Sequence, residues 1–268
     1  MFYSEIKPSE KLAKYIKCYW VLAQTDAAFP SESELILPDG CPEIIFNHAD
    51  SFRRHYPNQT EIQPLSIFVG QMRQSVLIEP TAAVKLFGIR FYPEGAYPLL
   101  KESLVGLTDK IEELDTVLGA LGKSLEDEIL SATSIAKKIG VFEKAVSKMF
   151  DHEQEGALVK NASGLIRKGK GLVRVEELAN QFEVSIKTLE RHFNREIGVS
   201  PKFFSRIMRL QEVLKLLNDG EEPIWTDIAY SFGYVDQAHF IKDFKDFAGV
   251  TPKIYHQQHN TINDSFIG

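Results

Sequence analysis

The C-terminal part of the chain carries a pattern of apolar residues at helical spacing that occurs twice. In its first copy, the apolar positions of Val175–Phe182 fall on one face of a helix. Ser185 is a good cap for a second helix, whose inner face would carry Leu189 and Phe193. Gly198 can adopt the left-handed backbone that ends such a helix. These features predict a small unit of two helices joined by a short turn.

The second copy repeats the same features in the same order. Phe193–Phe204 (FNREIGVSPKFF) recurs as Phe244–Tyr255 (FKDFAGVTPKIY), and Ile228–Phe232 matches the end of the first helix. Asp236 takes the capping position that Ser185 has in the first copy. An internal duplication of a helical unit with this spacing indicates two helix-turn-helix units.

A single longer helix is predicted between the two copies, over Pro201–Asn218. Pro suits the first position of a helix, and a stripe of mostly apolar residues follows it. The stripe consists of Phe204, Ile207, Met208, Gln211, Leu214 and Leu217. Such a helix would join the two units rigidly. Two recognition helices held about one DNA turn apart, roughly 34 Å, could enter successive segments of the major groove.

The N-terminal part has short runs of strand-forming residues, separated by Pro, Gly, Asn and Asp. The runs are Tyr15–Gln24, Ile44–Asn47, Ser66–Val69, Val76–Glu79 and Val84–Tyr92. Their spacing predicts a small β-barrel or β-sandwich. Apolar residues at helical spacing then predict three helices, over Thr108–Leu118, Leu121–Leu130 and Ile135–Phe150.

The polar segment Asp151–Glu155 is the expected boundary between two domains, residues 1–152 and 153–260. The first is expected to be a β-rich sensory or regulatory domain with helices at its C-terminal end. The second is expected to be all-α, with two helix-turn-helix units joined by the long helix. The predicted fold class is therefore α+β. Apolar stripes on the helices of the first domain could pair between chains, which suggests a homodimer.

Charge is distributed unevenly over these two parts. The chain has a formal net charge of −6, and residues 1–156 hold 16 Lys and Arg against 23 Asp and Glu. Residues 157–262 hold 15 Lys and Arg against 13 Asp and Glu. The acidic N-terminal part is a poor partner for DNA, and contact with DNA by the C-terminal part must depend on a local concentration of positive charge.

The chain resembles the AraC/XylS family of bacterial transcription regulators at these C-terminal residues. Ile228–Pro252 (IAYSFGYVDQAHFIKDFKDFAGVTP) is similar to the signature of that family's second unit, and the resemblance extends over about residues 157–257. A looser similarity links Leu37–Asn47 and Gly88–Gly95 to the sensory domain of some members. The resemblance implies a DNA-binding regulator of transcription, expected to be an activator, that has promoter DNA and RNA polymerase as partners.

The side chains opposite the inner faces of the two recognition helices are the expected DNA contacts. They are Lys187, Thr188, Glu190, Arg191 and Arg195 in the first unit, and Gln237, Ala238, His239, Lys242 and Lys245 in the second. Family members usually contact bases from the positions of Lys187, Glu190, Arg191, Ala238 and Lys242. Ala238 offers only an apolar contact, and Lys242 lacks the forked guanidinium that suits guanine. The alternative is that these residues form an ordinary solvated face.

A pocket for a small-molecule effector is expected in the β-rich domain, among apolar and aromatic side chains. The candidate residues are Trp20, Glu43, Phe46, Arg90 and Tyr92, with Phe87 and Phe91 as further aromatic candidates. Glu43 or Arg90 would hold a charged ligand. The alternative is an ordinary core with these two charged residues at its rim.

Enzymatic and metal-dependent functions find little support. The only cysteines are Cys18 and Cys41, and the chain contains no P-loop or GxGxxG motif. His48, Asp50 and His55 could suggest a metal site, but their polar segment is typical of a hairpin loop. Cys41 is interpreted as a half-buried residue after a turn, with a reactive thiol as the alternative. We therefore expect no catalytic residue, cofactor or metal.

No apolar run approaches the roughly 20 residues that span a bilayer, and the start, with Glu5 and Lys7, does not resemble a signal peptide. We therefore expect a cytoplasmic protein with no membrane partner. The sequence predicts a ligand-responsive, sequence-specific regulator of transcription. The alternative from another class is an enzyme or small-molecule binding protein that uses its helical part only for protein–protein contact.

Overall fold

The computed structural model describes residues 1–24, 33–56, 59–150, 157–218 and 223–257. Two antiparallel sheets form the N-terminal part. The first sheet has the order β1 (Phe2–Ile6), β2 (Ile16–Gln24), β9 (Val84–Phe91), β4 (Glu43–Asn47), β7 (Ser66–Val69) and β10 (Ile111–Glu113). The second has the order β3 (Glu34–Ile36), β8 (Val76–Pro80), β5 (Phe52–Tyr56) and β6 (Gln59–Ile62). The expected boundary segment at 151–155 lies outside the described residues.

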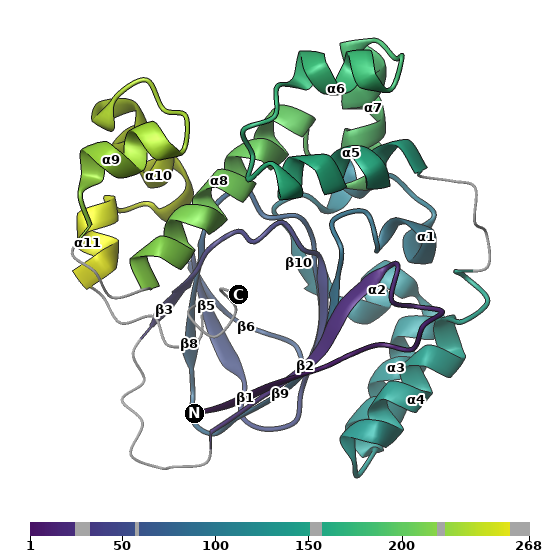
Figure 1. The fold of residues 1–268 in the computed structure, drawn as a ribbon. Helices are drawn as coiled ribbons and strands as arrows, with labels where there is room; N and C mark the ends of the chain where they lie inside the picture. Colours follow the sequence, from purple (N-terminus) through teal and green to yellow (C-terminus); the bar gives the residue numbers. More distant parts are fainter. Residues whose placement is uncertain (25–32, 57–58, 151–156, 219–222, 258–268) are drawn as a thin grey trace.

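The six-stranded sheet is covered on both faces, because its strands alternate apolar side chains between them. On one face, Phe46, Phe87 and Phe91 pack with α2 (Leu114–Leu118), α3 (Ala120–Ser131) and α4 (Ile135–Val146). On the other face, Trp20 and Leu22 point toward the four-stranded sheet and pack with Phe52. Figure 1 shows the two sheets beside each other, with α3 and α4 on the outer side.

The α+β fold class is confirmed, and the N-terminal part forms two sheets rather than a closed barrel. Each of the five predicted strand runs overlaps a strand of the structure. The expected hairpin loop at 48–55 is wrong at its end, because β5 begins at Phe52. Phe52 and Arg54 are buried while Arg53 and His55 face outward, so charged residues conceal the alternation of this strand.

The first predicted helix, over 108–118, is also corrected. Its N-terminal part is strand β10, which pairs with β7 and adds a sixth strand to the first sheet. The helix begins only at Leu114. Asp109 has a left-handed backbone with φ of 58°, which turns the chain into the strand. The apolar residues do have helical spacing from Leu114 onward, but a helix that included residues 111–113 would leave the edge of β7 without its partner strand.

The apolar stripes of α3 and α4 are buried inside the chain itself. Leu125, Ile129, Phe142 and Val146 all belong to the core beneath the six-stranded sheet. The stripes are therefore occupied by this sheet and cannot also pair with a second chain. This finding removes the observation on which the expected homodimer rested.

The C-terminal part is all-α, as predicted. Its helices are α5 (Ala157–Lys168), α6 (Val175–Gln181), α7 (Ile186–Glu196), α8 (Pro201–Asn218), α9 (Trp225–Ser231), α10 (Gln237–Ala248) and α11 (Pro252–Gln257). The N-terminal part also contains the short helix α1 (Tyr97–Leu100) and the 3-10 turn η1 (Leu104–Leu107). Ser185 caps α7 by accepting a hydrogen bond from Thr188 N at 3.1 Å. Asp236 caps α10 by accepting one from His239 N at 2.7 Å. Both predicted capping residues are confirmed.

Helix α8 lies between the group α5–α7 and the group α9–α11 (Figure 1), and it holds both recognition helices. The ring centroids of Phe193 on α7 and Phe204 on α8 lie 6.3 Å apart. On α10, buried Asp243 accepts hydrogen bonds from Arg206 Nε of α8 at 2.7 Å and from Tyr234 Oη at 2.9 Å. The predicted rigid connection of the two units by this helix agrees with these contacts.

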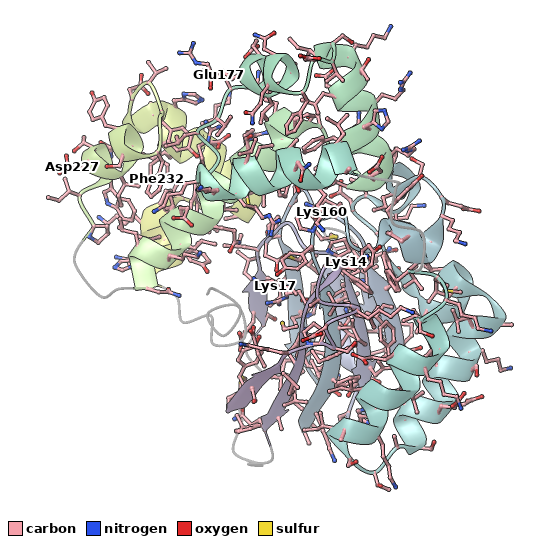
Figure 2. The ribbon with its side chains drawn as sticks, turned by 45° about the vertical axis from the view of Figure 1, so that its right-hand side comes forward. Lys14, Lys17, Lys160, Glu177, Asp227 and Phe232 are labelled. Carbon is pink, nitrogen blue, oxygen red and sulfur yellow. The ribbon has the colours of Figure 1, made fainter. Side chains whose placement is uncertain are left out.

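The helical part sits on one end of the sheets, and side chains fill the space between them (Figure 2). Ser163 of α5 donates a hydrogen bond to the carboxylate of Glu94 at 2.8 Å, and both side chains are buried. Thr108 Oγ1 donates to the main-chain oxygen of Gly198 at 2.7 Å, at the end of α7. The main-chain N–H of Ser75 donates to Phe247 O of α10 at 2.8 Å. Both recognition helices are thus anchored to the strand part at their C-terminal ends.

Candidate functional site

The first recognition helix, α7, presents charged residues to solvent. Leu189 and Phe193 are fully buried on its inner face, while Lys187 and Arg191 are exposed on the opposite face. Thr188 and Glu190 flank them and are half-buried. This orientation agrees with the spacing of apolar residues in the sequence, because burial of Leu189 and Phe193 fixes the rotation of the helix about its axis.

The second recognition helix, α10, has the same arrangement with fewer charges. Phe240 and Phe244 are buried, and the exposed residues that were predicted as DNA contacts are Ala238, His239, Lys242 and Lys245. Gln237, at the start of the helix, is half-buried. The imidazole of His239 stands edge-on to the ring of Tyr234, with 5.3 Å between their centroids.

Arg195 is a predicted DNA contact whose side chain lies against the strand part in this structure. Its guanidinium lies 5.3 Å from the centroid of the Tyr97 ring, in the strand part. Its Nη2 also donates a hydrogen bond to Glu196 Oε1 at 2.6 Å. Contact between Arg195 and DNA would therefore require its guanidinium to leave Tyr97.

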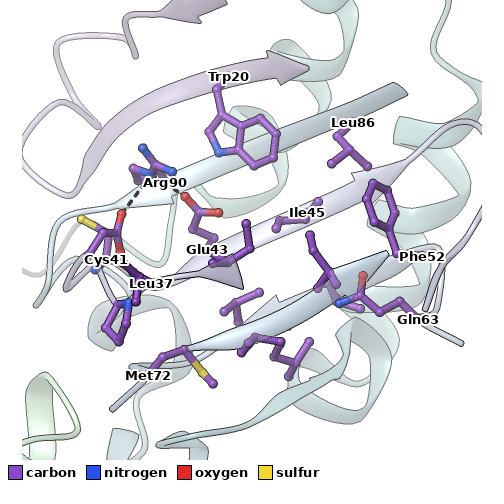
Figure 3. Close-up of a pocket in the computed structure, with 18 of the residues that line it drawn as sticks. Trp20, Leu37, Cys41, Glu43, Ile45, Phe52, Gln63, Met72, Leu86 and Arg90 are labelled. Atoms are coloured by element: carbon purple, nitrogen blue, oxygen red, sulfur yellow. Dashed lines mark hydrogen bonds and ion pairs between the residues drawn. The ribbon is translucent and has the colours of Figure 1, made fainter. Parts of the chain in front are cut away.

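A cavity of about 130 Å³ lies between the two sheets. Strand alternation explains its walls, because Glu43, Ile45 and Asn47 of β4 all point into it. Figure 3 shows Arg90, Glu43 and Cys41 toward one end and Phe52 and Leu86 toward the other. Most of the wall is apolar, and the charged groups gather at one end.

The charged end of the cavity is a buried cluster of one guanidinium and two carboxylates. Arg90 is only 2% exposed; its Nε donates a hydrogen bond to Glu43 and lies 3.5 Å from Asp39 Oδ2. Burial acts to lower the pKa of Arg90, but the charges of Glu43 and Asp39 outweigh it and hold that pKa well above its usual value. Arg90 therefore remains charged.

Three of the five predicted effector residues line this cavity, namely Trp20, Glu43 and Arg90. Phe46 does not, because it points to the opposite face of the sheet and packs in the core beneath α2–α4. The same holds for Phe87 and Phe91, which are one residue out of phase with the lining positions of β9. Tyr92 lies past the end of β9, where its ring packs against the guanidinium of Arg167 at 4.9 Å.

Sequence reasoning missed Gln71 and Gln211, which also line the cavity. Gln71 follows β7 and had no signal in the sequence. Gln211 belongs to α8, and its side chain reaches the cavity from the helical part. A single polar residue in the otherwise apolar stripe of Pro201–Asn218 was the available signal for Gln211. Its Nε2 donates a hydrogen bond to Pro38 O at 2.8 Å.

The groups considered for other chemistry have different roles here. His48 Nε2 lies 2.6 Å from Lys138 Nζ, and His55 Nε2 lies 2.8 Å from the carboxylate of Glu79. Within the part of the chain that the structure describes, no group of three or more His, Cys, Asp or Glu could hold a metal ion. Burial raises the pKa of the Cys41 thiol, which therefore stays protonated.

None of the helices in the described ranges is long and apolar enough to cross a membrane.

Two family models match the chain. One, described as "Domain of unknown function (DUF6597)", matches residues 4–113, and the other, described as "Helix-turn-helix domain", matches residues 178–258. The second match identifies residues 178–258 as a helix-turn-helix domain.

Relatives in this class are transcriptional activators. The chain is 32% identical over 87 residues to the HTH-type transcriptional activator RhaS of Klebsiella pneumoniae (strain 342), covering 32% of this chain and 31% of that protein. It is 36% identical over 73 residues to RhaS of Escherichia coli O139:H28, covering 27% of this chain and 26% of that one. The chain thus spans about a third or less of these relatives' length. These matches confirm the predicted resemblance of the C-terminal part of the chain to helix-turn-helix regulators of transcription.

Solved structures are also similar to the chain. ToxT from Vibrio cholerae O395 has a TM-score of 0.48 and 14% identity, covering 88% of this chain and 95% of that one. The C-terminal domain of AraT from Geobacillus stearothermophilus has a TM-score of 0.37 and 28% identity, covering 40% of this chain and 89% of that one.

Proposed function

We propose that this protein is a sequence-specific regulator of transcription whose DNA affinity responds to a small molecule bound between its two sheets. The observation that carries the proposal is the position of α8. This one helix holds both recognition helices and also forms part of the cavity wall through Gln211. A change at the cavity can therefore reach the DNA-binding surface through a single rigid element.

The exposed faces of α7 and α10 support DNA as the partner. Lys187 and Arg191 on α7, and Lys242 and Lys245 on α10, are exposed and supply positive charge where the acidic chain as a whole does not. Arg191 offers a forked guanidinium that pairs well with guanine. Lysine supplies a point charge suited to phosphate, and phosphate contacts make binding weaken as salt concentration rises.

Close packing between the cavity segment and α8 supports the response to a ligand. Gly40 lines the cavity, and a Cβ built on it would lie 2.8 Å from Met208 Cε and 3.0 Å from Phe204 Cε2. Leu37, from the same segment, is buried among side chains of the helical part. A ligand that displaces Pro38–Cys41 would therefore press on the side chains of Phe204 and Met208 of α8.

Activation through RNA polymerase is the further part of this proposal, and the names of the RhaS relatives support it. A cytoplasmic location would follow from a DNA partner. An enzymatic role gains no support from the described residues, because Glu43 is paired with Arg90 and the nearby thiol of Cys41 is protonated.

Selection of bound fragments from genomic DNA by the full-length protein tests the proposal. The expected result is enrichment of asymmetric sites by the parent protein and loss of enrichment for Arg191→Ala. Lys168→Ala, which changes an exposed lysine on α5, is the matched control and should behave as the parent. Lack of enrichment by a folded parent protein would contradict DNA recognition and favour a role in protein–protein contact.

A further inference from the structure

Gln71 is a buried amide that faces the cavity without a partner. Its side chain is only 2% exposed and lines the cavity between the sheets. Neither its Oε1 nor its Nε2 has a hydrogen-bond partner among the residues that the structure describes. A buried polar group without a hydrogen-bond partner destabilises the folded protein. The structure retains this cost at the wall of a cavity, which is where a ligand could remove it.

The unmet groups of Gln71 restrict the chemistry of that ligand. Its amide needs a donor for Oε1 and an acceptor for Nε2. A carboxylate offers only acceptors, and an ammonium offers only donors, so either one would leave half of the amide unmet. A hydroxyl or a carboxamide offers both.

The charged cluster disfavours an anion in the same cavity. Arg90 is already engaged by Glu43 and Asp39, so the cluster holds two carboxylates for one guanidinium. An anionic ligand would have to displace Glu43 from Arg90 and would still face the remaining negative charge. The sequence suggested that Glu43 or Arg90 would hold a charged ligand, and the pairing of these groups with each other disfavours that role.

The remaining wall sets the size and polarity of the rest of the ligand. It is formed largely by apolar side chains, which include Trp20, Ile36, Ile45, Phe52, Ile78 and Leu86. The volume of about 130 Å³ is close to that of an apolar cavity of about 150 Å³ that accommodates benzene. One ring or a short branched chain fits this space.

We infer that the cavity binds a small uncharged molecule, of one ring or a short hydrocarbon chain, whose hydroxyl or carboxamide pairs with the side-chain amide of Gln71. This inference names the ligand class of the effector site and rests on the proposed function only for its regulatory meaning. The position of Gln71 supports that meaning, because a Cβ built on Gly198, at the end of α7, would lie 3.4 Å from Gln71 Cβ. A ligand on Gln71 thus lies beside the support of one recognition helix.

Calorimetric titration of the full-length protein with a matched set of one-ring probes tests the inference. Benzamide and benzyl alcohol carry the required group, benzoate and benzylamine carry a charge, and toluene has no polar group. We expect benzamide and benzyl alcohol to bind at least tenfold more tightly than the other three probes. Equal binding of benzoate and benzamide, or no binding of any probe at millimolar concentration, would overturn the inference.

Gln71→Leu should remove the preference by lowering the affinity for benzamide to that for toluene. The variant should keep its fold, since it deletes an unmet polar group from a buried site, and Gln71→Met serves if it does not. Gln74→Leu is the control, because Gln74 is exposed and does not line this cavity, so this variant should retain the preference. An unchanged preference in folded Gln71→Leu would sink the inference. Failure of DNA recognition would leave these titrations unaffected, so the two proposals fail separately.

Discussion

The side-chain amide of Gln211 donates a hydrogen bond to the main-chain oxygen of Pro38 over 2.8 Å. The bond joins the middle of α8 to the segment Leu37–Cys41, which forms part of the cavity wall. A net contribution of about 0.5–1.5 kcal/mol is typical of such a bond, so it alone does not hold the two parts together. Its importance lies in its position, because the same glutamine also lines the cavity.

Gly40→Ala is expected to loosen the packing between the cavity segment and α8. Gly40 has a φ of +81°, and a new Cβ would meet Met208 at 2.8 Å. Left-handed backbone costs a non-glycine residue roughly 1–2 kcal/mol, and overpacking adds about 1–3 kcal/mol. The free energy of unfolding in urea measures the sum.

Gly249→Ala provides the control for backbone strain alone. Gly249 has a φ of +72°, and nothing lies within 4 Å of a Cβ built on it. Its alanine variant should therefore lose only the roughly 1–2 kcal/mol of left-handed strain. If the two variants lose the same free energy of unfolding, the contact between Gly40 and Met208 has no energetic weight.

Arg191→Ala is expected to separate DNA reading from folding. Arg191 is exposed, so its loss should leave the melting temperature nearly unchanged, yet cost about 1–3 kcal/mol of specific binding if it pairs with a guanine. Phe193→Ala, two residues away and fully buried, should instead destabilise the protein by about 3–5 kcal/mol. Titration against a selected and a scrambled site, paired with thermal melts, measures both. Arg191→Ala that binds both DNAs as the parent does would mean that another surface of α7 docks on DNA.

Lys242→Ala is expected to have a smaller and less selective effect than Arg191→Ala. Lys242 is exposed at the equivalent position of α10, but an ammonium lacks the fork that recognises guanine. Its loss should weaken binding to all sequences alike and reduce the salt dependence, as expected of a phosphate contact. Competition titrations at several salt concentrations would reveal a sequence-selective loss, which would assign Lys242 to a base instead.

Glu94→Gln is expected to stabilise the protein at neutral pH. Burial raises the pKa of Glu94 beneath α5, although the Ser163 hydrogen bond acts to lower it. Because the folded chain then holds this proton more tightly than the unfolded chain, the glutamate weakens folding increasingly as pH rises above about 4.3, the unfolded value. The advantage of the glutamine should therefore grow from pH 4 to pH 7 in urea unfolding.

Glu102→Gln, at an exposed position, is the control for that pH series and should show no such growth. An advantage of Glu94→Gln that is independent of pH would mean that the carboxyl group keeps the same pKa in both states. The contact between α5 and Glu94 would then have no part in the acid response of the protein.

Local signals in the sequence were sufficient for the helical part. Ser185 and Asp236 could be recognised as caps because a cap depends on its own residue type and on the next three residues. The rotation of α7 about its axis could be predicted from Leu189 and Phe193, because residues four positions apart lie on the same face of a helix. The duplication then confirmed each assignment with a second copy.

The cavity could be predicted only in part, because its lining depends on strand phase and on contacts distant in the chain. Phe46 and Glu43 are both plausible lining residues by type, but they lie three positions apart and so face opposite sides of β4. Gln211 approaches from α8; its place in an apolar stripe marks it as unusual, but no local pattern indicates that it reaches the cavity. Strand β5 was not predicted, because Arg54 is buried between Phe52 and Tyr56, and in a sequence an arginine at that position is typical of an exposed loop.

Leu37 stands in the strand part of the chain but contributes its side chain to the core of the helical part. The border between the two parts in space is therefore not the border in sequence. If the helical half were transplanted onto a different sensing domain, α8 would lack the leucine that fills its flank and the glycine that lets a main chain approach Met208. The two halves have to be inherited, or engineered, together with the short segment Leu37–Gly40.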